Sequence, residues 1–266
     1  MSLNVALQLC SLRDAVIEDM RGTLEKVKAM GYDGVEFANL RGNSPESVKQ
    51  MCREIGLVPI SAHIPYHKLI LDPEAVFDEY AAVGCKYIAI CYLKEEHRMG
   101  TEHEPVLIEN LKSFGQMAKD RGMTLLYHNH SFEFRETNGK YDLDAMYDAV
   151  PAELLASEHD VCWIKASGVD PAEYIRRYAG RCPLVHLKDF SGDIVAERDG
   201  LGYPQRADNF EYACVGSGVL DIPSVLCAAK ESGTEWLIVE QDRPTEGMTP
   251  EECAKQSVEY LRSIKY

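Results

Sequence analysis

The sequence predicts an α/β protein that folds as one (β/α)8 barrel, a single domain over residues 1–266. Eight short apolar runs alternate with amphipathic segments, and strands that alternate with helices in this way indicate a parallel sheet. A barrel of eight such units takes about 250 residues, which fits this chain better than an open doubly wound sheet does. No Gly-rich nucleotide fingerprint follows the first apolar run, and no linker-like stretch divides the chain.

Eight candidate strands supply the predicted sheet. In chain order they are NVALQLC (4–10), GVEFA (34–38), VPISAH (58–63), KYIAICY (86–92), TLLYH (124–128), LLASEHD (154–160), PLVHLKD (183–189) and EWLIVEQD (235–242). One long irregular stretch, residues 191–223, follows the seventh strand and is rich in Gly, Pro, Asp and Tyr. Because long loops in compact domains are usually functional or disordered, we expect this stretch to lie over the site.

The segments between the strands carry helical patterns. Residues 16–30 place four apolar side chains on one face, close to the 3.6-residue period: Ile17, Met20, Leu24 and Val27. Residues 44–56 open with a serine cap and a glutamate and close on a glycine, which are the usual start and stop signals of a helix. Two further amphipathic stretches, at 104–122 and 249–264, are also predicted to be helices.

Charge and cysteine content narrow the class of protein. The net charge of −15 argues against nucleic-acid binding, which needs a basic surface, and against an anionic membrane surface. No apolar run approaches the ~20 residues that span a bilayer, and the N-terminal stretch has no basic region typical of a signal peptide. The nine cysteines are scattered without a C-x-x-C pair, which predicts reduced thiols in a cytoplasmic protein.

Polar residues gather where the predicted strands end. This matters because the active site of such a barrel lies at the carboxyl ends of its strands. The eight ends offer Gln8 with Ser11 and Arg13, Glu36 with Asn39, His63 with Tyr66 and His67, Tyr92, His128 with His130 and Glu133, Asp160, His186 with Lys188 and Asp189, and Glu240 with Asp242 and Arg243. Any one of them is explained by a surface position or a hydrogen-bonded core histidine. Their concentration at the strand ends is not explained in this way. Six of the eight histidines lie in or just after candidate strand ends: His63, His67, His128, His130, His159 and His186.

Four of these residues form a predicted metal site: Glu133, Asp160, His186 and Glu240. A carboxylate buried alone is costly, so carboxylates inside apolar runs need a partner or a cation. One Asp, one His and two Glu favour a divalent ion such as Mn, Mg or Co, with Zn also compatible. His128 is the alternative ligand from the fifth strand.

At these residues the sequence resembles the xylose-isomerase-like TIM barrels of the sugar phosphate isomerase/epimerase superfamily. The resemblance covers nearly the whole chain through an ordered set of segments: LQLCSLRD, MGYDGVEFAN, SAHIPY, LLYHNHSFEF, HDVCWIKASGVDP, VHLKDFSG, GSGVLDIPSVL and WLIVEQDRP. It implies a barrel enzyme acting on a sugar, keto-sugar or cyclitol. Each segment alone is weakly specific, and the ordered set identifies the superfamily without identifying the reaction.

The resemblance also implies that strands five to eight hold the metal through Glu, Asp, His and Glu. Asp160, His186 and Glu240 match these positions, but the fifth strand departs from the pattern. It has His128 near the expected Glu, and Glu133 comes five residues later. A further departure is Trp163, where ketose epimerases have a histidine. The sequence therefore looks closer to the inosose dehydratase and 3-keto-sugar branch than to the ketose 3-epimerases.

The implied activity is that of an isomerase or epimerase that removes a proton next to a carbonyl and passes through an enediolate. The same site could instead expel a β-substituent, as a dehydratase or lyase does. Expected acid–base residues are Glu240, Glu133 and His63, and expected substrate-binding residues are Glu36, His128, Lys188, Trp163 and Arg13.

Two rival classes share this barrel. A DNA-repair endonuclease would need more metal ligands and a less acidic surface than this sequence offers. A sugar-binding barrel without catalysis would not be expected to keep Asp160, His186 and Glu240. Dimers or tetramers are common among relatives, so the resemblance implies a homo-oligomer.

Overall fold

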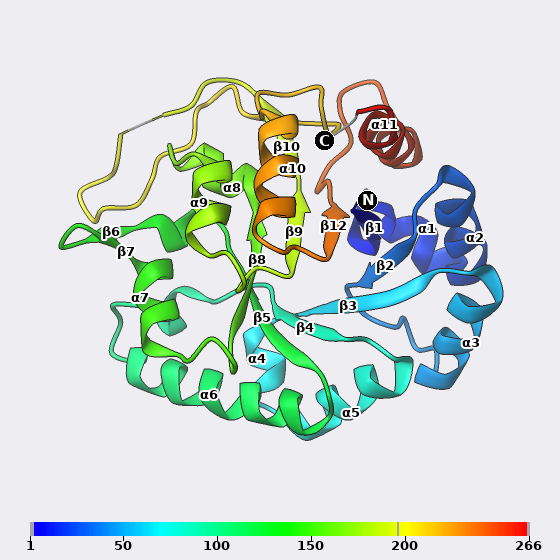
Figure 1. Cartoon of the computed structure of the whole chain (residues 1–266), viewed down its shortest axis with the longest axis horizontal. Helices are drawn as coiled ribbons and strands as arrows, with labels where there is room; N and C mark the ends of the chain where they lie inside the picture. The colour runs from blue at the N-terminus through cyan, green and yellow to red at the C-terminus, as the bar shows by residue number, and fades with distance from the viewer. Residues whose placement is uncertain (1–2, 196, 265–266) are drawn as a thin grey trace.

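The computed structural model describes residues 3–195 and 197–264 and shows a closed parallel barrel (Figure 1). Its strands follow one another around the barrel in the order β1-β12-β9-β8-β5-β4-β3-β2. Their bounds are β1 (Asn4–Gln8), β2 (Gly34–Phe37), β3 (Val58–Ile64), β4 (Tyr87–Ile90), β5 (Thr124–His128), β8 (Ala156–Asp160), β9 (Leu184–Leu187) and β12 (Trp236–Val239). Each overlaps one of the predicted runs, so the (β/α)8 barrel is confirmed.

Helices surround the barrel and connect its strands (Figure 1). The α-helices are α1 (Arg13–Glu18), α2 (Met20–Met30), α3 (Pro45–Ile55), α4 (Tyr66–Leu69), α5 (Pro73–Val83), α6 (Glu104–Asp120), α7 (Asp142–Ala149), α8 (Val161–Ala166), α9 (Pro171–Arg177), α10 (Ile222–Glu231) and α11 (Pro250–Ser263). Short 3-10 turns are η1 (Leu9–Leu12), η2 (Glu95–His97) and η3 (Phe132–Phe134). Within the described ranges no helix is both long and apolar enough to cross a membrane.

The helix predicted over residues 16–30 is divided in two at Asp19. This residue has extended backbone angles, φ −153° and ψ 96°, and its side chain accepts a hydrogen bond from the Gly22 N–H. An aspartate that caps a new helix in this way competes with continuation of the preceding one. The predicted apolar face is therefore spread over α1 and α2, and the other three predicted helices appear as α3, α6 and α11.

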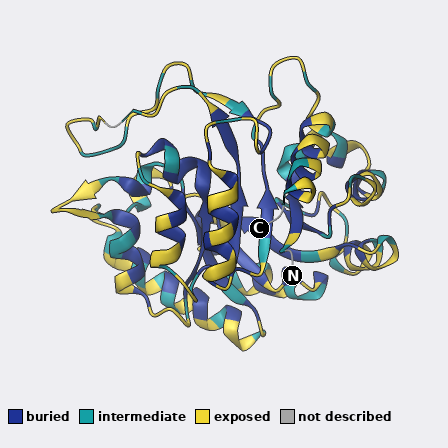
Figure 2. Ribbon diagram, turned by 45° about the horizontal axis from the view of Figure 1, so that its top comes forward, coloured by how far each residue is buried: buried dark blue, intermediate teal, exposed yellow. Residues whose placement is uncertain are grey.

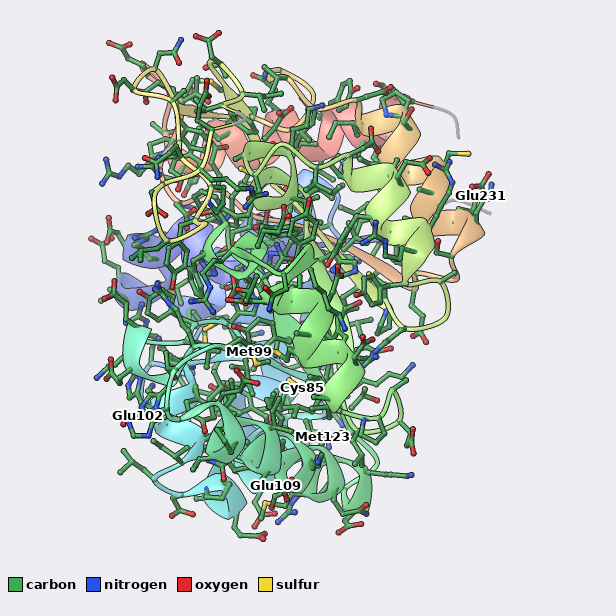
Figure 3. All side chains as sticks on the ribbon, turned by 90° about the vertical axis from the view of Figure 1, so that its left-hand side faces the viewer. Cys85, Met99, Glu102, Glu109, Met123 and Glu231 are labelled. Atoms are coloured by element: carbon green, nitrogen blue, oxygen red, sulfur yellow. The ribbon has the colours of Figure 1, made fainter. Side chains whose placement is uncertain are left out.

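Most of the hydrophobic core lies between the barrel and its helices, as the burial colouring shows (Figure 2). Met99, Cys85 and Met123 belong to this core, whereas Glu102 and Glu231 lie on the exposed periphery (Figure 3). A second, smaller cluster fills the barrel itself near the amino ends of the strands. We call it the lower layer; it contains Ala6, Ile60, Tyr87, Ala89, Leu126, Ala156, Leu184 and Ile238.

The long segment predicted over residues 191–223 is partly ordered, and its residue 196 lies outside the described residues. It contains β11 (Glu211–Ala213), which pairs antiparallel with β10 (Asp189–Ser191), and α10 begins before it ends. The segment also contacts the chain that follows β5, where β6 (Glu136–Thr137) and β7 (Lys140–Tyr141) form a small hairpin. There the Glu136 N–H donates to the Gly202 carbonyl. The segment therefore contacts the chain that follows β5, and its expected place over the site stays a prediction.

Candidate metal centre and active site

The polar centre of the barrel follows from the alternation of side chains along each strand. Every second residue of a barrel strand points inward. On β8 the inward series is Ala156, Glu158 and Asp160, all buried, so one strand passes from the lower layer to two carboxylates. His186 on β9 and Glu240, the residue after β12, each stand two positions beyond a residue of the lower layer. Polar groups thus occupy the half of the interior nearest the carboxyl ends of the strands.

Four donor groups nearest the mouth form what we call the outer group: His128, Asp160, His186 and Glu240. One ligand atom from each lies within 4.8 Å of the others. His186 Nδ1 is 3.2 Å from Glu240 Oε2, and His128 Nε2 is 3.7 Å from Asp160 Oδ2. The outer group contains three of the four predicted metal ligands and the alternative ligand from the fifth strand.

Asp160 shows why the outer group fits a cation. Its Oδ1 accepts hydrogen bonds from the N–H groups of Cys162 and Trp163 and caps α8. Its Oδ2 is buried and accepts no hydrogen bond from any described residue. Its charged neighbour there is the Lys188 ammonium, with Nζ at 3.4 Å. A buried carboxylate oxygen without a hydrogen bond is costly unless a cation lies beside it. Two imidazole nitrogens and two carboxylates are a donor set that suits Zn, Mn or Co.

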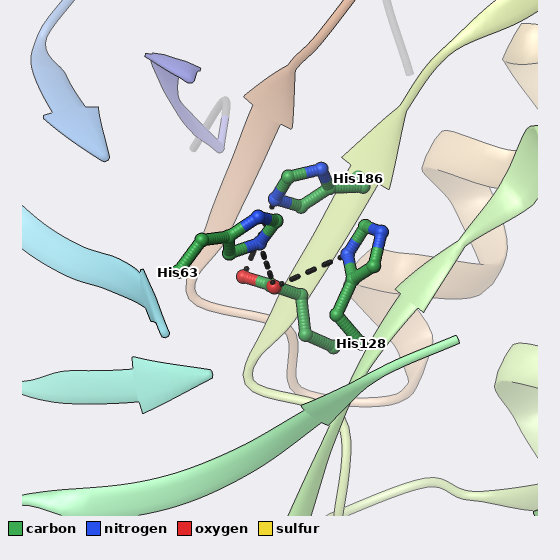
Figure 4. Close-up of side chains that lie close together, drawn as sticks. His63, His128 and His186 are labelled. Atoms are coloured by element: carbon green, nitrogen blue, oxygen red, sulfur yellow. Dashed lines mark hydrogen bonds and ion pairs between the residues drawn. The ribbon is translucent and has the colours of Figure 1, made fainter. Parts of the chain in front are cut away.

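A second set of side chains lies deeper and forms what we call the inner group: His63, His128, Glu158 and His186. The three imidazoles converge there (Figure 4). Glu158 Oε2 is 2.7 Å from His63 Nε2 and 3.3 Å from His128 Nδ1. Glu36 joins this set, since its Oε1 lies 2.8 Å from His186 Nε2 and 3.1 Å from His63 Nε2. His63, predicted as an acid–base residue, and Glu36, predicted to bind substrate, therefore bond within this inner network.

Lys188 lies between the outer group and the mouth. Its Nζ is 2.9 Å from Glu240 Oε2, 2.9 Å from Asp242 Oδ2 and 3.4 Å from Asp160 Oδ2. Burial disfavours the charged form, but the surrounding carboxylates outweigh it and hold the pKa of Lys188 well above its usual range. The buried ammonium also lies 5.5 Å from the centre of the Trp163 ring. Lys188 is thus a fixed positive charge beside the predicted ligands.

The two outer carboxylates differ in their electrostatic surroundings. Burial raises the pKa of Asp160 to about 6, although Lys188 and His186 oppose the rise. For Glu240 burial also acts to raise the pKa, but Lys188 and His186 prevail and hold it well below its usual range. Cys10 lies beside it, and its Sγ–H donates to Glu240 Oε1 over 2.8 Å. Glu240 is therefore ionised, and its carboxylate contacts Lys188, His186 and Cys10.

Glu133, predicted as both ligand and acid–base group, lies in η3, beyond the end of β5. Its carboxylate accepts hydrogen bonds from the Tyr127 hydroxyl at 2.5 Å and from the His130 N–H at 2.8 Å. Burial raises its pKa to about 7. Glu133 belongs to neither the outer nor the inner group, whereas His128 belongs to both. Its predicted role as a ligand stays a prediction that this placement does not favour.

Trp163 and Arg13 lie on the rim of the barrel. The Trp163 ring stacks between His130, at 5.6 Å, and Phe210 of the long segment, at 5.8 Å between centroids. Arg13 is exposed and donates to the carbonyl groups of Cys10, at 3.0 Å, and Asp242, at 2.7 Å. It lines a cavity of about 520 Å³ between the segments that follow β1 and β12, to which no residue of the outer or inner group contributes. Both residues are placed near the site, and their predicted contacts with substrate stay predictions.

Three residues were misjudged or missed in the sequence. Glu158 was not singled out, although it lies two positions before Asp160 and therefore on the same face of β8. His159 was counted among the strand-end histidines, but it points to the other face and contacts Tyr147, Tyr174 and Tyr178. Cys10 was predicted only to be a reduced thiol. Period-two alternation would have identified Glu158.

Asp189 organises the loop that follows β11. Its carboxylate accepts hydrogen bonds from the N–H groups of Gly216 and Gly218, both at 3.0 Å, and of Leu220 at 3.3 Å. Loops in this part of such barrels commonly use backbone N–H groups to bind a phosphate. Here an internal carboxylate occupies those donors.

Comparison with known proteins supports the same fold. A family model described as "Xylose isomerase-like TIM barrel" matches residues 24–264. The inosose dehydratase of Geobacillus kaustophilus (strain HTA426) is 23% identical over 265 residues, covering 90% of this chain and 85% of that protein.

Two solved structures have the same architecture. A sugar phosphate isomerase/epimerase from Parabacteroides distasonis ATCC 8503 superposes with a TM-score of 0.80 at 21% identity, covering 99% of this chain and 97% of that one. The IolI protein with a bound zinc atom gives 0.73 at 16% identity, covering 98% and 96%. The resemblance inferred from the sequence is confirmed, and the chain belongs to the xylose isomerase-like TIM barrel family.

Proposed function

We propose that this protein is a divalent-metal-dependent dehydratase that removes water from an unphosphorylated keto-sugar or inosose. The outer group would hold the metal through His128, Asp160, His186 and Glu240, with His128 as the ligand from β5. The convergence of these four donor groups, with an Asp160 Oδ2 that accepts no hydrogen bond from any described residue, is the observation that carries the metal assignment. The names of the inosose dehydratase relatives agree with the proposed reaction.

Dehydration is favoured over epimerisation by the kind of ligand on β5. Epimerisation returns a proton to the opposite face of the same carbon, which is served by a second acid–base group across the substrate. His128 stands where a second carboxylate would be needed, and its ring lies between Glu158 and Asp160. Both carboxylates of the outer group contact a protein acid, Lys188: Glu240 Oε2 lies 2.9 Å from its Nζ and Asp160 Oδ2 lies 3.4 Å from it. This arrangement supports proton removal and leaving-group protonation from the same side.

The proposed steps use Glu240 and Lys188. A divalent ion, when bound, withdraws charge from the substrate carbonyl and makes the neighbouring C–H more acidic. The Glu240 carboxylate takes this proton, and the C–H electron pair becomes the new C=C bond. The C–O bond at the β-carbon breaks, and the Lys188 ammonium gives its proton so that the hydroxyl leaves as water. Transfer of the proton from Glu240 back to Lys188, across their 2.9 Å contact, restores both groups.

Asp189 supports a substrate without a phosphate. Its carboxylate already takes the three loop N–H groups that a phosphate would use, and a second anion there would meet its negative charge. The expected result is that keto-sugars react while their phosphate esters do not, and that inorganic phosphate does not compete with substrate. Inhibition by millimolar phosphate would contradict this part of the proposal.

The reaction is tested by incubating the Mn-loaded protein in D2O with keto-sugars and inososes. Dehydration predicts an unsaturated ketone, seen by ultraviolet absorbance, and a product lighter than the substrate by one water. A product that has lost no water and differs from the substrate formula only by one deuterium in place of hydrogen would contradict dehydration. It would identify the protein as an isomerase or epimerase. Glu235→Gln is the matched control, because Glu235 bonds Lys86 and Tyr87 near the amino ends of the strands.

The isomerase or epimerase predicted from the sequence remains the second candidate because of Glu133. This buried carboxylate lies next to the end of β5, and its pKa near 7 suits a general acid–base group. If the protein epimerises, Glu133→Gln would abolish proton return while leaving metal binding intact. If it dehydrates as proposed, the same substitution leaves the composition of the product unchanged.

A further inference from the structure

We propose that Gln8 and Cys10 are positioning residues that fix the plane of the Glu240 carboxylate and keep one of its oxygens on Lys188. The proposal rests on the role given to Glu240 as the base of the proposed reaction. It concerns the turn η1, which follows β1 and takes no part in the proposed steps. A carboxylate at the end of a side chain rotates about a broad, two-fold torsion, so its plane is set by the groups that bond its two oxygens.

The turn after β1 holds the backbone of the segment that follows β12. The Gln241 N–H donates to Ser11 Oγ at 3.0 Å, and Arg13 Nη2 donates to the Asp242 carbonyl at 2.7 Å. Both bonds end on backbone atoms of that segment. The main chain on the C-terminal side of Glu240 is therefore fixed independently of the Glu240 side chain.

The Glu240 carboxylate has different partners on its two oxygens. Its Oε2 lies 2.9 Å from Lys188 Nζ and 3.2 Å from His186 Nδ1. Its Oε1 accepts a hydrogen bond from the Cys10 thiol at 2.8 Å, and a thiol keeps its proton near neutral pH. Cys10 is the one described residue that donates a hydrogen bond to Oε1. Without this bond the carboxylate is free to turn, and Oε2 leaves its place beside Lys188.

Gln8 in turn holds Cys10. It stands two positions beyond Ala6 of the lower layer, so its buried side chain points into the barrel. Its Oε1 accepts from the Cys10 N–H at 3.0 Å, and its Nε2 donates to Glu36 Oε1 at 2.7 Å. A backbone N–H can only donate, so the oxygen of the amide faces Cys10 and its nitrogen faces Glu36. An unbroken chain of contacts thus runs from Glu36 through Gln8 and Cys10 to Glu240.

The first test measures steady-state kinetics of the Mn-loaded, full-length protein with the keto-sugar or inosose that the D2O experiment identifies. Misplacement of a reacting group costs up to about 10²-fold in rate, so kcat of Cys10→Ala should fall by about 10- to 100-fold. Its KM and Tm should stay at the wild-type values, because Ser11 and Arg13 still hold the backbone. Cys10→Ser keeps a donor at this position and should recover most of the lost kcat.

Cys227→Ala is the matched control for Cys10→Ala. The Cys227 thiol also donates to a carboxylate, Glu231 Oε1 at 3.3 Å, but it lies exposed on α10, and kcat should not change. An unchanged kcat in Cys10→Ala would overturn the proposal. So would an equal loss in Cys10→Ser, or a loss of kcat that follows a fall in Tm.

The part assigned to Gln8 is tested by a double-mutant cycle. Gln8→Met removes both polar contacts of Gln8 and keeps an unbranched side chain. Because residues in one hydrogen-bonded chain are coupled, Gln8→Met/Cys10→Ala should lose no more kcat than the slower single variant. Losses that multiply would overturn the role of Gln8. The experiments on Cys10 do not depend on this variant.

A spectroscopic measurement makes the test independent of turnover. The S–H stretching band of Cys10 is isolated as the infrared difference between the wild type and Cys10→Ala. It should lie at a lower frequency than the band of Cys52, a thiol of the hydrophobic core, and equal frequencies would overturn the proposal. A lowered band in a protein that dehydrates no keto-sugar would count against the proposed function alone. Dehydration with an unchanged kcat in Cys10→Ala would count against this proposal alone.

Discussion

The two halves of the barrel interior are built from the same strands and differ in what they enclose. The lower layer is apolar apart from the tip of Tyr87, whose hydroxyl bonds Glu235 at the end of the barrel. Two residues further along the strands, the interior holds buried carboxylates, imidazoles and an ammonium group. The lower half gains from burial alone, whereas the upper half is stable only because its charges are paired. One strand can therefore supply stability at one residue and chemistry two residues later.

The sharpest contrast is between Ile238 of β12, which belongs to the lower layer, and Glu240 just after β12, which belongs to the outer group. Substitution of Glu240, the upper member of this pair, should show the largest effect. Glu240→Gln removes the proposed base and a metal ligand, and we expect dehydration to slow by about 10²- to 10⁴-fold. The free energy of unfolding should fall as well, because the neutral amide leaves the buried Lys188 ammonium with one carboxylate fewer. Steady-state kinetics with a urea titration checks both. A variant that keeps wild-type turnover would remove Glu240 from the mechanism.

Substitution of the lower member, Ile238, should lower stability without affecting metal binding. Ile238→Ala leaves a cavity in the lower layer and is expected to lower the free energy of unfolding by about 2–5 kcal/mol. The fraction that stays folded should still bind metal with wild-type affinity. Ile238→Val is the control, with an expected loss of about 0.5–1.5 kcal/mol. A loss of metal affinity in Ile238→Ala would show that the two halves are coupled rather than separable.

Metal removal tests the upper half without any substitution. At a metal concentration of about 100 times Kd, binding to the folded state alone adds about 2.7 kcal/mol of stability. For a chain of this size that corresponds to a rise in Tm of roughly 5–10 °C. Thermal unfolding with and without EDTA measures the difference. Ile238→Ala should gain the same increment on loading, because its defect lies in the other half.

The smallest effect concerns pH, through Asp160. Its folded-state pKa is raised to about 6, above the ordinary value of 3.8, so the protein without metal binds this proton more tightly when folded. The resulting stabilisation is complete below about pH 4 and is lost as the pH rises through about 6. Protons and metal compete for the same oxygen, so metal affinity should weaken as the pH falls below 6. Asp160→Asn should remove this part of the pH dependence in calorimetric titrations.

The fold was predictable because its signals are local. Apolar runs such as KYIAICY, and helix caps such as Ser44 and Gly56, can be recognised within a few residues, and the structure places β4 and α3 there. The break at Asp19 was not predicted, because the apolar period continues across it. Whether that aspartate caps a new helix depends on a backbone angle that the period does not reveal.

The candidate site was predictable in part. Asp160, His186 and Glu240 converge in the outer group, since the carboxyl ends of parallel strands must meet. Glu158 was not predicted because it lies inside β8 rather than at its end. A residue deeper in the barrel gains its partners only when the sheet closes. The contact between Cys10 and Glu240 joins residues 230 positions apart and arises in the same closure.

Asp189 has a consequence for how binding specificity could change. The loop beyond β11 binds an anion through three backbone N–H groups, and that anion is the Asp189 carboxylate of the same chain. Substitution of Asp189 by Gly or Ser would free these three N–H groups without altering any residue of the metal centre. A descendant of this protein could thus acquire an affinity for phosphorylated compounds through a single substitution.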